Sequence, residues 1–501
     1  MNIQLVTKTR KTGDLVVPLF EKEEIPESAR RQLSRKDRDF LRLYLKRDKV
    51  RGENVKSLLL PGNAKRILIL GKGNKKNWNH RKARILVRRI VQSMKTANLK
   101  EGTLIMESVA QTATLAEKAK LLENTAAELV IADYAHNEYK ETPKEGWPTI
   151  HKMQLATDYS ADEKRRLLEA VANGVIIGEE TNHTRRLSNM PGGDMTPQKL
   201  AAAAEEAGKQ TKVKVTILDE KQIKKLGMGG VIGVSRGSSE KPRFIIMEYK
   251  HPDYKQAPLV LVGKGVTFDT GGLNLKPDKA IHEMHMDMSG GAAVIHGVAA
   301  ISRLNIPIHV VGLIPAVENM PSGSSYHPGD ILRSITGRTI EVLNTDAEGR
   351  IILADALGYA KRYNPRLVVD IATLTGAAMV ALGQRVSALF TKDEKLEELF
   401  RSLGESSGDY LWPMPLWDEY EEDIKGTFGD VANVGKTEAY GGSITAAMFL
   451  SQFVSYPWVH IDMAPTMTAI DSDKLAKGAK GTGVRLFTAL ARHLATPSTE
   501  K

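Results

Sequence analysis

Four continuous apolar runs stand out in the second half of the chain. They lie at residues 244–247, 259–262, 308–313 and 367–370. Runs without polar alternation are typical of strands that are buried on both faces of a sheet. Segments of helical composition lie between them, for example residues 291–304 and 351–363. This alternation predicts an α/β domain in which helices cover a central sheet.

The N-terminal third repeats this alternation on a smaller scale. Residues 67–70 (ILIL) predict a strand, and residues 129–132 (LVIA) predict another. After the first strand comes Gly-Lys-Gly at 71–73, which we interpret as a strand-to-helix turn rather than a phosphate cradle. A helix is predicted next, because apolar side chains recur at i, i+3, i+4, i+7, i+8 and i+11. They are Ala83, Leu86, Val87, Ile90, Val91 and Met94.

The two α/β regions are separated by a segment that favours a helix. Residues 161–180 contain no proline and have helical composition. A loop follows at Pro191-Gly192-Gly193, and Thr196-Pro197 is typical of the start of the next helix. We therefore expect an N-terminal α/β domain at residues 1–158, a linker helix at 159–182 and a larger domain at 183–501.

Composition indicates a cytoplasmic globular protein. Cysteine is absent from the 501 residues, which removes disulfides and thiolate metal sites from consideration. The N-terminus lacks an apolar segment of signal-peptide length. No apolar run approaches the ~20 residues that a membrane helix needs. We expect no membrane association.

The positive charge is concentrated in the N-terminal third. Residues 1–150 hold 31 Lys and Arg against 18 Asp and Glu, whereas residues 151–501 hold 40 against 42. The segment 72–89 mixes basic side chains with Trp78 and His80. Such a face could contact a polyanion, and DNA binding is therefore an alternative function of this domain. A solvated basic face, or one paired with another subunit, is the competing interpretation. The basic residues are Lys75, Lys76, Arg81, Lys82, Arg84, Arg88 and Arg89.

Charged residues gather in three segments of the larger domain. Residues 344–350 (NTDAEGR) place Asp346 and Glu348 two positions apart, and Lys264, Asp269, Lys276 and Asp287 lie upstream. Each of these alone would be an ordinary turn, helix-cap or surface residue. Their conjunction among buried strand ends and glycine-rich turns indicates a metal site, because buried charges are normally paired or bind metal. Carboxylates can bridge two divalent ions, and an oxygen-rich set suits Zn, Mn, Mg or Co without choosing among them.

At these residues the chain resembles the leucine aminopeptidase family, two-metal exopeptidases that include bacterial aminopeptidase A. The resemblance covers about residues 180–490. The matching segments are residues 262–272 (VGKGVTFDTGG), 286–290 (MDMSG), 344–350 (NTDAEGR), 370–377 (DIATLTGA) and 432–435 (ANVG). It implies an α/β/α catalytic domain whose central mixed sheet carries the two-metal site, joined by a helix to the smaller N-terminal α/β domain.

The resemblance also implies roles for the charged residues. One ion would be held by Lys264, Asp269, Asp287 and Glu348, and the other by Asp269, Asp346 and Glu348. Lys276 would stabilise the oxyanion. Bicarbonate would act as general base, held by Arg350 and by the backbone amides of Ala347, Gly349 and Leu374. The pocket for the N-terminal side chain would use Met284, Thr373, Gly376, Ala464 and Met467.

These roles predict a leucyl aminopeptidase that cleaves short peptides with a free N-terminus. Family members are homohexamers with active sites facing an internal cavity, and we expect the same assembly here. A binding protein with an inactive site is disfavoured, because every matched catalytic position is intact. A two-metal phosphoesterase is a remote alternative, since a lysine ligand argues against it.

Overall fold

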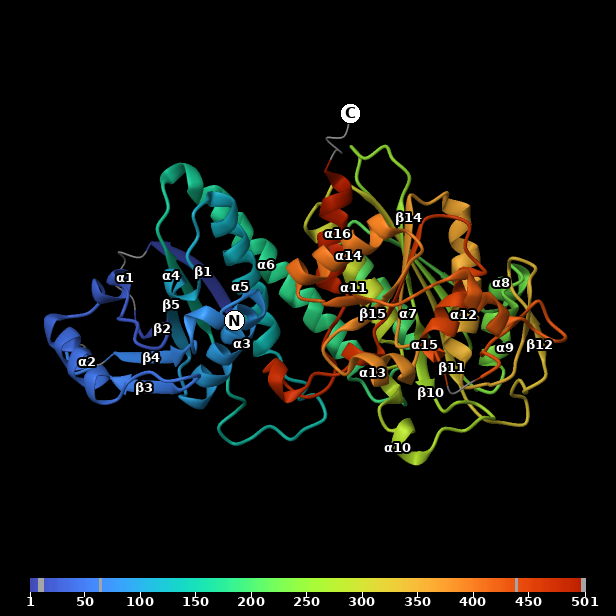
Figure 1. The fold of residues 1–501 in the computed structure, drawn as a ribbon, viewed down its shortest axis with the longest axis horizontal. Helices are drawn as coiled ribbons and strands as arrows, with labels where there is room; N and C mark the ends of the chain where they lie inside the picture. The colour runs from blue at the N-terminus through green and yellow to red at the C-terminus, as the bar shows by residue number, and fades with distance from the viewer. Residues whose placement is uncertain (8–12, 63–64, 438–439, 497–501) are drawn as a thin grey trace. The chain divides into compact units, whose positions relative to one another are not determined.

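The fold is described from a computed structural model that covers residues 1–7, 13–62, 65–437 and 440–496. It divides into two compact units (Figure 1). The first comprises Met1–Glu179 and Ile470–Lys477, and the second comprises Glu180–Ala469 and Gly478–Lys501. Within the described residues, no helix has the length and apolar character that a membrane crossing requires.

A six-stranded sheet forms the centre of the first unit. All neighbouring strands pair in parallel except the edge strand β3, which is antiparallel to β4. The spatial order is β1 (Asn2–Thr7), β6 (Lys152–Thr157), β5 (Glu101–Ile105), β2 (Leu15–Leu19), β4 (Arg66–Gly71) and β3 (Val55–Leu59). The strand predicted at residues 67–70 is thereby confirmed as β4.

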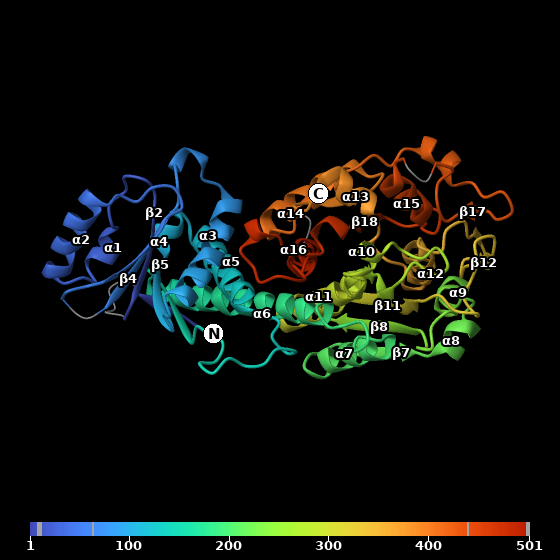
Figure 2. The ribbon, with the colours of Figure 1, turned by 90° about the horizontal axis from the view of Figure 1, so that it is seen from below.

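Helices cover both faces of this sheet (Figure 2). Side chains alternate along β2, so that Val16 packs toward α3 and α5 while Val17 packs toward α1 and α2. The helices are α1 (Glu27–Arg30), α2 (Arg35–Arg47), α3 (His80–Thr96), α4 (Met106–Val109) and α5 (Leu115–Asp133). The predicted apolar face of α3 is confirmed, since five of its six residues are buried: Leu86, Val87, Ile90, Val91 and Met94.

The strand predicted at residues 129–132 is wrong, because this run is the last turn of α5. Thr114 and Glu117 form a reciprocal capping box that starts the helix. Leu122, Ala126 and Leu129 then follow at helical spacing and enter the same core cluster. Four consecutive apolar residues do not distinguish a strand from a buried helix end.

Three arginines of the predicted basic surface are buried instead. Arg88 Nε donates to Glu128 Oε2 at 2.6 Å, and Arg84 Nη1 donates to Glu128 Oε1 at 3.3 Å. Arg89 donates to the carbonyl oxygens of Gly71 at 3.1 Å and of Glu53. These side chains therefore hold α3 against its neighbours, and the interpretation of Arg84, Arg88 and Arg89 as a nucleic-acid surface is wrong.

Glu128 should accordingly matter for stability. Its side chain is 1 % exposed, so Glu128→Ala would leave two buried guanidinium groups without their carboxylate. We expect a loss of about 3 kcal/mol or more in the free energy of unfolding, measured by urea denaturation. Glu24→Ala, which removes an exposed ion pair with Arg30, should cost under about 1 kcal/mol. Equal losses in the two variants would contradict this role.

Helix α6 (Ala161–Ser188) crosses the boundary between the units. It begins two residues after the start of the linker helix expected at 159–182 and continues six residues past its expected end. The loop at Pro191–Gly193 is confirmed, and Thr196 caps α7 (Pro197–Lys209) by accepting a hydrogen bond from the amide of Lys199.

The second unit is built on a nine-stranded mixed sheet. β15 is antiparallel to β18, and β8 is antiparallel to both β11 and β7, whereas the remaining neighbours are parallel. The order is β16 (Leu411–Pro413), β15 (Ser387–Phe390), β18 (Trp458–Asp462), β14 (Leu367–Ala372), β9 (Leu259–Gly263), β11 (His309–Asn319), β8 (Arg243–Lys250) and β7 (Lys214–Leu218); β10 (Gly265–Asp269) also pairs with β11. The four predicted apolar strands are β8, β9, β11 and β14.

Two layers of helices enclose this sheet and give the expected α/β/α arrangement. Along β9, Leu261 enters one core cluster and Val262 the opposite one. The first cluster includes α7, α11 (Ser289–Arg303), α14 (Glu394–Ser407) and α16 (Val484–Ala495). The second includes α8 (Glu220–Lys225), α9 (Gly229–Ser235), α12 (Glu348–Ala360), α13 (Gly376–Leu382) and α15 (Gly442–Ser451).

Smaller elements lie outside these layers. A three-stranded sheet has the order β12 (Ile331–Arg333), β13 (Thr339–Glu341), β17 (Val431–Ala432). Helix α10 (Asp278–Ile281) and the 3-10 helix η2 (Met284–Met286) follow β10.

Candidate active site

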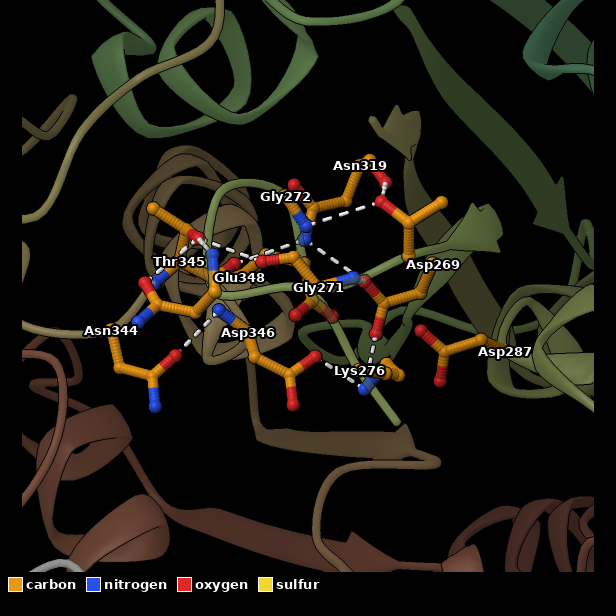
Figure 3. Close-up of polar contacts among 12 residues, drawn as sticks. Asp269, Gly271, Gly272, Lys276, Asp287, Asn319, Asn344, Thr345, Asp346 and Glu348 are labelled. Atoms are coloured by element: carbon orange, nitrogen blue, oxygen red, sulfur yellow. Dashed lines mark hydrogen bonds and ion pairs between the residues drawn. The ribbon is translucent and has the colours of Figure 1, made fainter. Parts of the chain in front are cut away.

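The four predicted carboxylates come together where strands of the larger sheet end (Figure 3). Asp269 is the last residue of β10, and Asp287 lies between η2 and α11. Asp346 precedes α12, and Glu348 is its first residue. Asp269, Asp287 and Glu348 are at most 3 % exposed. The carboxyl ends of parallel strands are the usual place for a ligand in such sheets.

Two lysines neutralise part of this charge. Lys264 Nζ lies 2.8 Å from Asp287 Oδ2 and 2.9 Å from Glu348 Oε1. Lys276 Nζ lies 2.9 Å from Asp269 Oδ2 and also pairs with Asp346. Burial alone would lower the pKa of both lysines, but the surrounding carboxylates outweigh it and raise the pKa of each.

Gly349 permits the approach of Lys264 to this cluster. A Cβ atom at position 349 would lie 2.6 Å from Lys264 Cε and 2.7 Å from Nζ. A larger residue would therefore displace the lysine from the start of α12. The glycine of the 344–350 motif has a packing role here that its sequence context alone does not reveal.

The donor set fits a divalent metal centre. Oxygen atoms of Asp269, Asp346 and Glu348 lie within 4.8 Å of one another. Glu348 Oε2 is buried and has no hydrogen-bond partner among the described residues. Burial, followed by the charge of Asp269, raises the pKa of Glu348 to about 8. Carboxylates crowded in this way are stabilised by cations, and hard or borderline divalent ions prefer such oxygens.

Asn319 and Tyr326 support the cluster, and neither was selected from the sequence pattern. Asn319 Nδ2 donates to Asp269 Oδ1 and to the carbonyl oxygen of Thr345, both at 2.9 Å. The hydroxyl of Tyr326 donates to the same carbonyl at 2.6 Å. These bonds fix the orientation of a candidate ligand and of the 344–350 segment. The sequence feature that could have identified Asn319 is its position at the end of a buried strand, β11.

Thr373 also contacts the cluster directly. Its hydroxyl donates to Asp287 Oδ1 at 2.7 Å, and its carbonyl oxygen accepts from Lys264 Nζ at 3.0 Å. The sequence placed Thr373 only in the substrate pocket. The structure additionally makes it a partner of two candidate metal ligands.

Arg350 lies one helical position beyond Gly349 and is buried. Its Nη1 donates to the carbonyl oxygen of Asn433 at 2.9 Å, while Nε has no hydrogen-bond partner among the described residues. Burial lowers the pKa of this guanidinium to about 10. A buried guanidinium with an unused N–H suits an anion.

The three amides expected beside Arg350 differ in their partners. The Leu374 amide donates to Asp462 Oδ1 at 3.1 Å, and the Ala347 amide donates to the Asn344 carbonyl at 3.3 Å. Gly349 lies in the first turn of α12, where amides have no partner within the helix. Asp462 therefore competes for one of the predicted anion contacts.

The other residues expected to form the side-chain pocket lie on three segments. Met284 is half-buried in η2, and Gly376 is exposed at the start of α13. Ala464 and Met467 are buried after β18, and Met467 packs against Met286.

Comparison with known proteins gives matches over nearly the whole chain. Residues 182–488 match the model of the cytosol aminopeptidase family, catalytic domain, and residues 16–143 match the N-terminal domain of the same family. Two relatives are each described as a probable cytosol aminopeptidase. The protein from Nitrosococcus oceani is 37 % identical over 97 % of each chain, and that from Azoarcus sp. is 40 % identical over 95 % of each.

A solved structure shares the architecture. The bottromycin maturation enzyme BotP in complex with Mn superposes with a TM-score of 0.84 at 30 % sequence identity. The match covers 97 % of this chain and 100 % of that one.

Proposed function

Because this chain belongs to the cytosol aminopeptidase family, and is therefore a metal-dependent aminopeptidase, we propose that it uses two metal ions to release leucine and similar residues from peptides. One observation carries this proposal. The oxygens of Asp269, Asp346 and Glu348 converge within 4.8 Å in a buried site that also contains two lysines.

The ions would be held by the residues that the sequence selects. Lys264, Asp269, Asp287 and Glu348 would bind one ion, and Asp269, Asp346 and Glu348 the other. The carboxylates raise the pKa of Lys264, so the bound dication would have to displace its proton and leave a neutral amine. Mn or Zn are the proposed metals, with Mg or Co as further options. The presence of Mn in the BotP structure, which shares 30 % of its sequence with this chain, agrees with this choice. Bound ions of this kind supply Lewis acidity and an activated water.

Residues of the chain would complete the reaction. The ammonium of Lys276 lies within reach of the carboxylates and would offset negative charge that develops on the substrate carbonyl oxygen. Arg350, with the amides of Ala347, Gly349 and Leu374, would hold bicarbonate, which accepts a proton as general base. Binding at the Leu374 amide would require that amide to leave Asp462.

The substrate would be a short peptide with a free N-terminus. Its α-amino group carries a lone pair when neutral, and a metal centre can bind that nitrogen. Met284, Thr373, Gly376, Ala464 and Met467 would line the pocket for its first side chain. Methionine is apolar and adaptable, so a preference for leucine-like side chains follows.

The proposals for the oligomeric state and the cellular location also rest on membership of the family. We propose a homohexamer that acts in the cytoplasm. DNA binding stays a prediction that rests on charge, and of the residues first considered for it, Lys75, Lys76, Arg81 and Lys82 are exposed. Arg84, Arg88 and Arg89 carry no part of it.

Hydrolysis of leucine p-nitroanilide by metal-stripped protein tests the proposed function. We expect no cleavage without metal, recovery with Mn or Zn, and no cleavage of the N-acetylated substrate under any condition. Equal cleavage of the acetylated compound would contradict recognition of the free amine. Failure of both metals to restore cleavage in folded protein would contradict the metal centre.

A further inference from the structure

A second cluster of potential metal ligands lies between α6 and α11. Glu180 and His183 lie three residues apart in α6, and His296 projects from α11. One donor atom from each of these residues lies within 4.8 Å of the other two. His296 is seven residues beyond the start of α11, about 10 Å along the helix axis. The cluster is thus separate from the carboxylates around Asp287.

The three donor atoms face one another closely. Glu180 Oε2 lies 2.7 Å from His296 Nδ1 and 3.5 Å from His183 Nδ1. The two imidazole rings have centroids 5.2 Å apart. Two ligands of a tetrahedral Zn²⁺, at bond lengths of ~2.0–2.1 Å, lie about 3.3 Å apart. The Glu180–His183 separation already suits an ion, and the Glu180–His296 pair needs to open by roughly half an ångström.

Glu180 is held in place by a further partner. Its other oxygen, Oε1, accepts from Arg303 Nη1 at 2.6 Å. This contact orients the carboxylate and leaves Oε2 directed at both histidines. Outer partners of this kind are typical of carboxylates that bind metals.

The site is open to solvent on one side, so that an ion could enter. Glu180 and His296 are buried, whereas the His183 side chain is 47 % exposed. Metal ions bind the neutral imidazole, and burial lowers the pKa of His296, which favours that form. Two imidazoles and one carboxylate favour Zn²⁺, Co²⁺ or Ni²⁺ over Mg²⁺ or Ca²⁺, which prefer oxygen ligands.

From this geometry we propose that Glu180, His183 and His296 form a binding site for one divalent transition-metal ion, additional to the catalytic centre. The ion would link α6 to α11, the helix that follows Asp287. Solvent would complete its coordination on the side of His183. The competing description is an ion-pair network of Glu180, His296 and Arg303 that joins the same helices without metal.

Metal content separates these two descriptions. The full chain carrying Asp269→Asn and Glu348→Gln, which removes candidate catalytic ligands, is equilibrated with Co²⁺ and freed of excess metal. Bound cobalt is then compared with the same protein carrying His183→Ala in addition. We expect about one Co²⁺ per chain more in the first protein, with visible absorption of coordinated Co²⁺ that the His183→Ala protein lacks.

Two controls distinguish loss of the site from misfolding and from unspecific cobalt binding. His183 is half-exposed, so its replacement should preserve the fold, which circular dichroism would verify. The control His327→Ala removes another exposed histidine, paired only loosely with Asp330 at 3.7 Å, and should leave cobalt content unchanged. Removal of one ligand should weaken Co²⁺ affinity at least about tenfold. Equal cobalt content with and without His183 would overturn the proposal in favour of the ion-pair network.

Discussion

The variant Glu348→Ala should lose aminopeptidase activity by about 1,000-fold or more, together with bound metal. Glu348 pairs with Lys264 through Oε1, and its buried Oε2 has no hydrogen-bond partner in the described part of the chain. Its removal would take away the oxygens that can face both ions. It would also leave Lys264 with one carboxylate fewer.

Metal analysis and peptide hydrolysis on the same preparation would test this expectation. Glu341→Gln serves as the control, because Glu341 is also buried in the second unit but accepts backbone N–H bonds from Thr427 and Phe428. That variant should keep its metal and most of its activity. A Glu348→Ala protein that retained both metal equivalents would contradict the ligand assignment.

The variant Lys276→Met should behave differently, with kcat lowered by about 100- to 1,000-fold and metal content preserved. Lys276 is not among the proposed ligands, and its ammonium lies beside Asp269 and Asp346 at the edge of the cluster. Methionine keeps the apolar stem and most of the length of the side chain but removes the positive charge. Loss of charge stabilisation should therefore appear in kcat rather than in KM.

Steady-state kinetics on leucine p-nitroanilide with fully metallated protein would measure this effect. Lys279→Met is the matched control, because Lys279 is exposed in the adjacent helix α10 and carries the same charge. Its kcat should change less than about twofold. If Lys276→Met matched the control, an oxyanion role for Lys276 would be untenable.

The convergence of the candidate site residues was predictable, because short spacings along the chain restrict which side chains can share one centre. Asp346 and Glu348 are two residues apart, so one turn presents both to the same centre. Lys264 follows the predicted strand at 259–262, and Asp269 ends the short strand β10 that comes next. Apolar runs bounded by glycine-rich turns imply buried strand ends, and charged residues at such ends require partners.

The contacts that orient those residues were not predictable. Asn319 reaches Asp269 across 50 positions of sequence, and Thr373 reaches Asp287 across 86. Nothing in the local pattern of either segment specifies the pairing. It arises because β9 and β10 pair one after the other along the same edge of β11, and because β14 adjoins β9 in the mixed sheet.

Sequence by itself thus determined the family, the α/β layers and the residues proposed for the metal site, since these depend on periodicity and on short, specific spacings. Tertiary structure alone decided which charges are available to solvent. By sequence pattern, Arg84 and Arg88 lie on the polar side of an amphipathic helix and should be exposed. In the fold they are buried against Glu128 of α5, which lies 44 residues after Arg84 and 40 after Arg88. Glu180 and His296 meet by the same kind of long-range packing. A buried charge needs a partner, and that partner is often distant in the sequence. The local pattern of apolar and polar residues therefore cannot identify it.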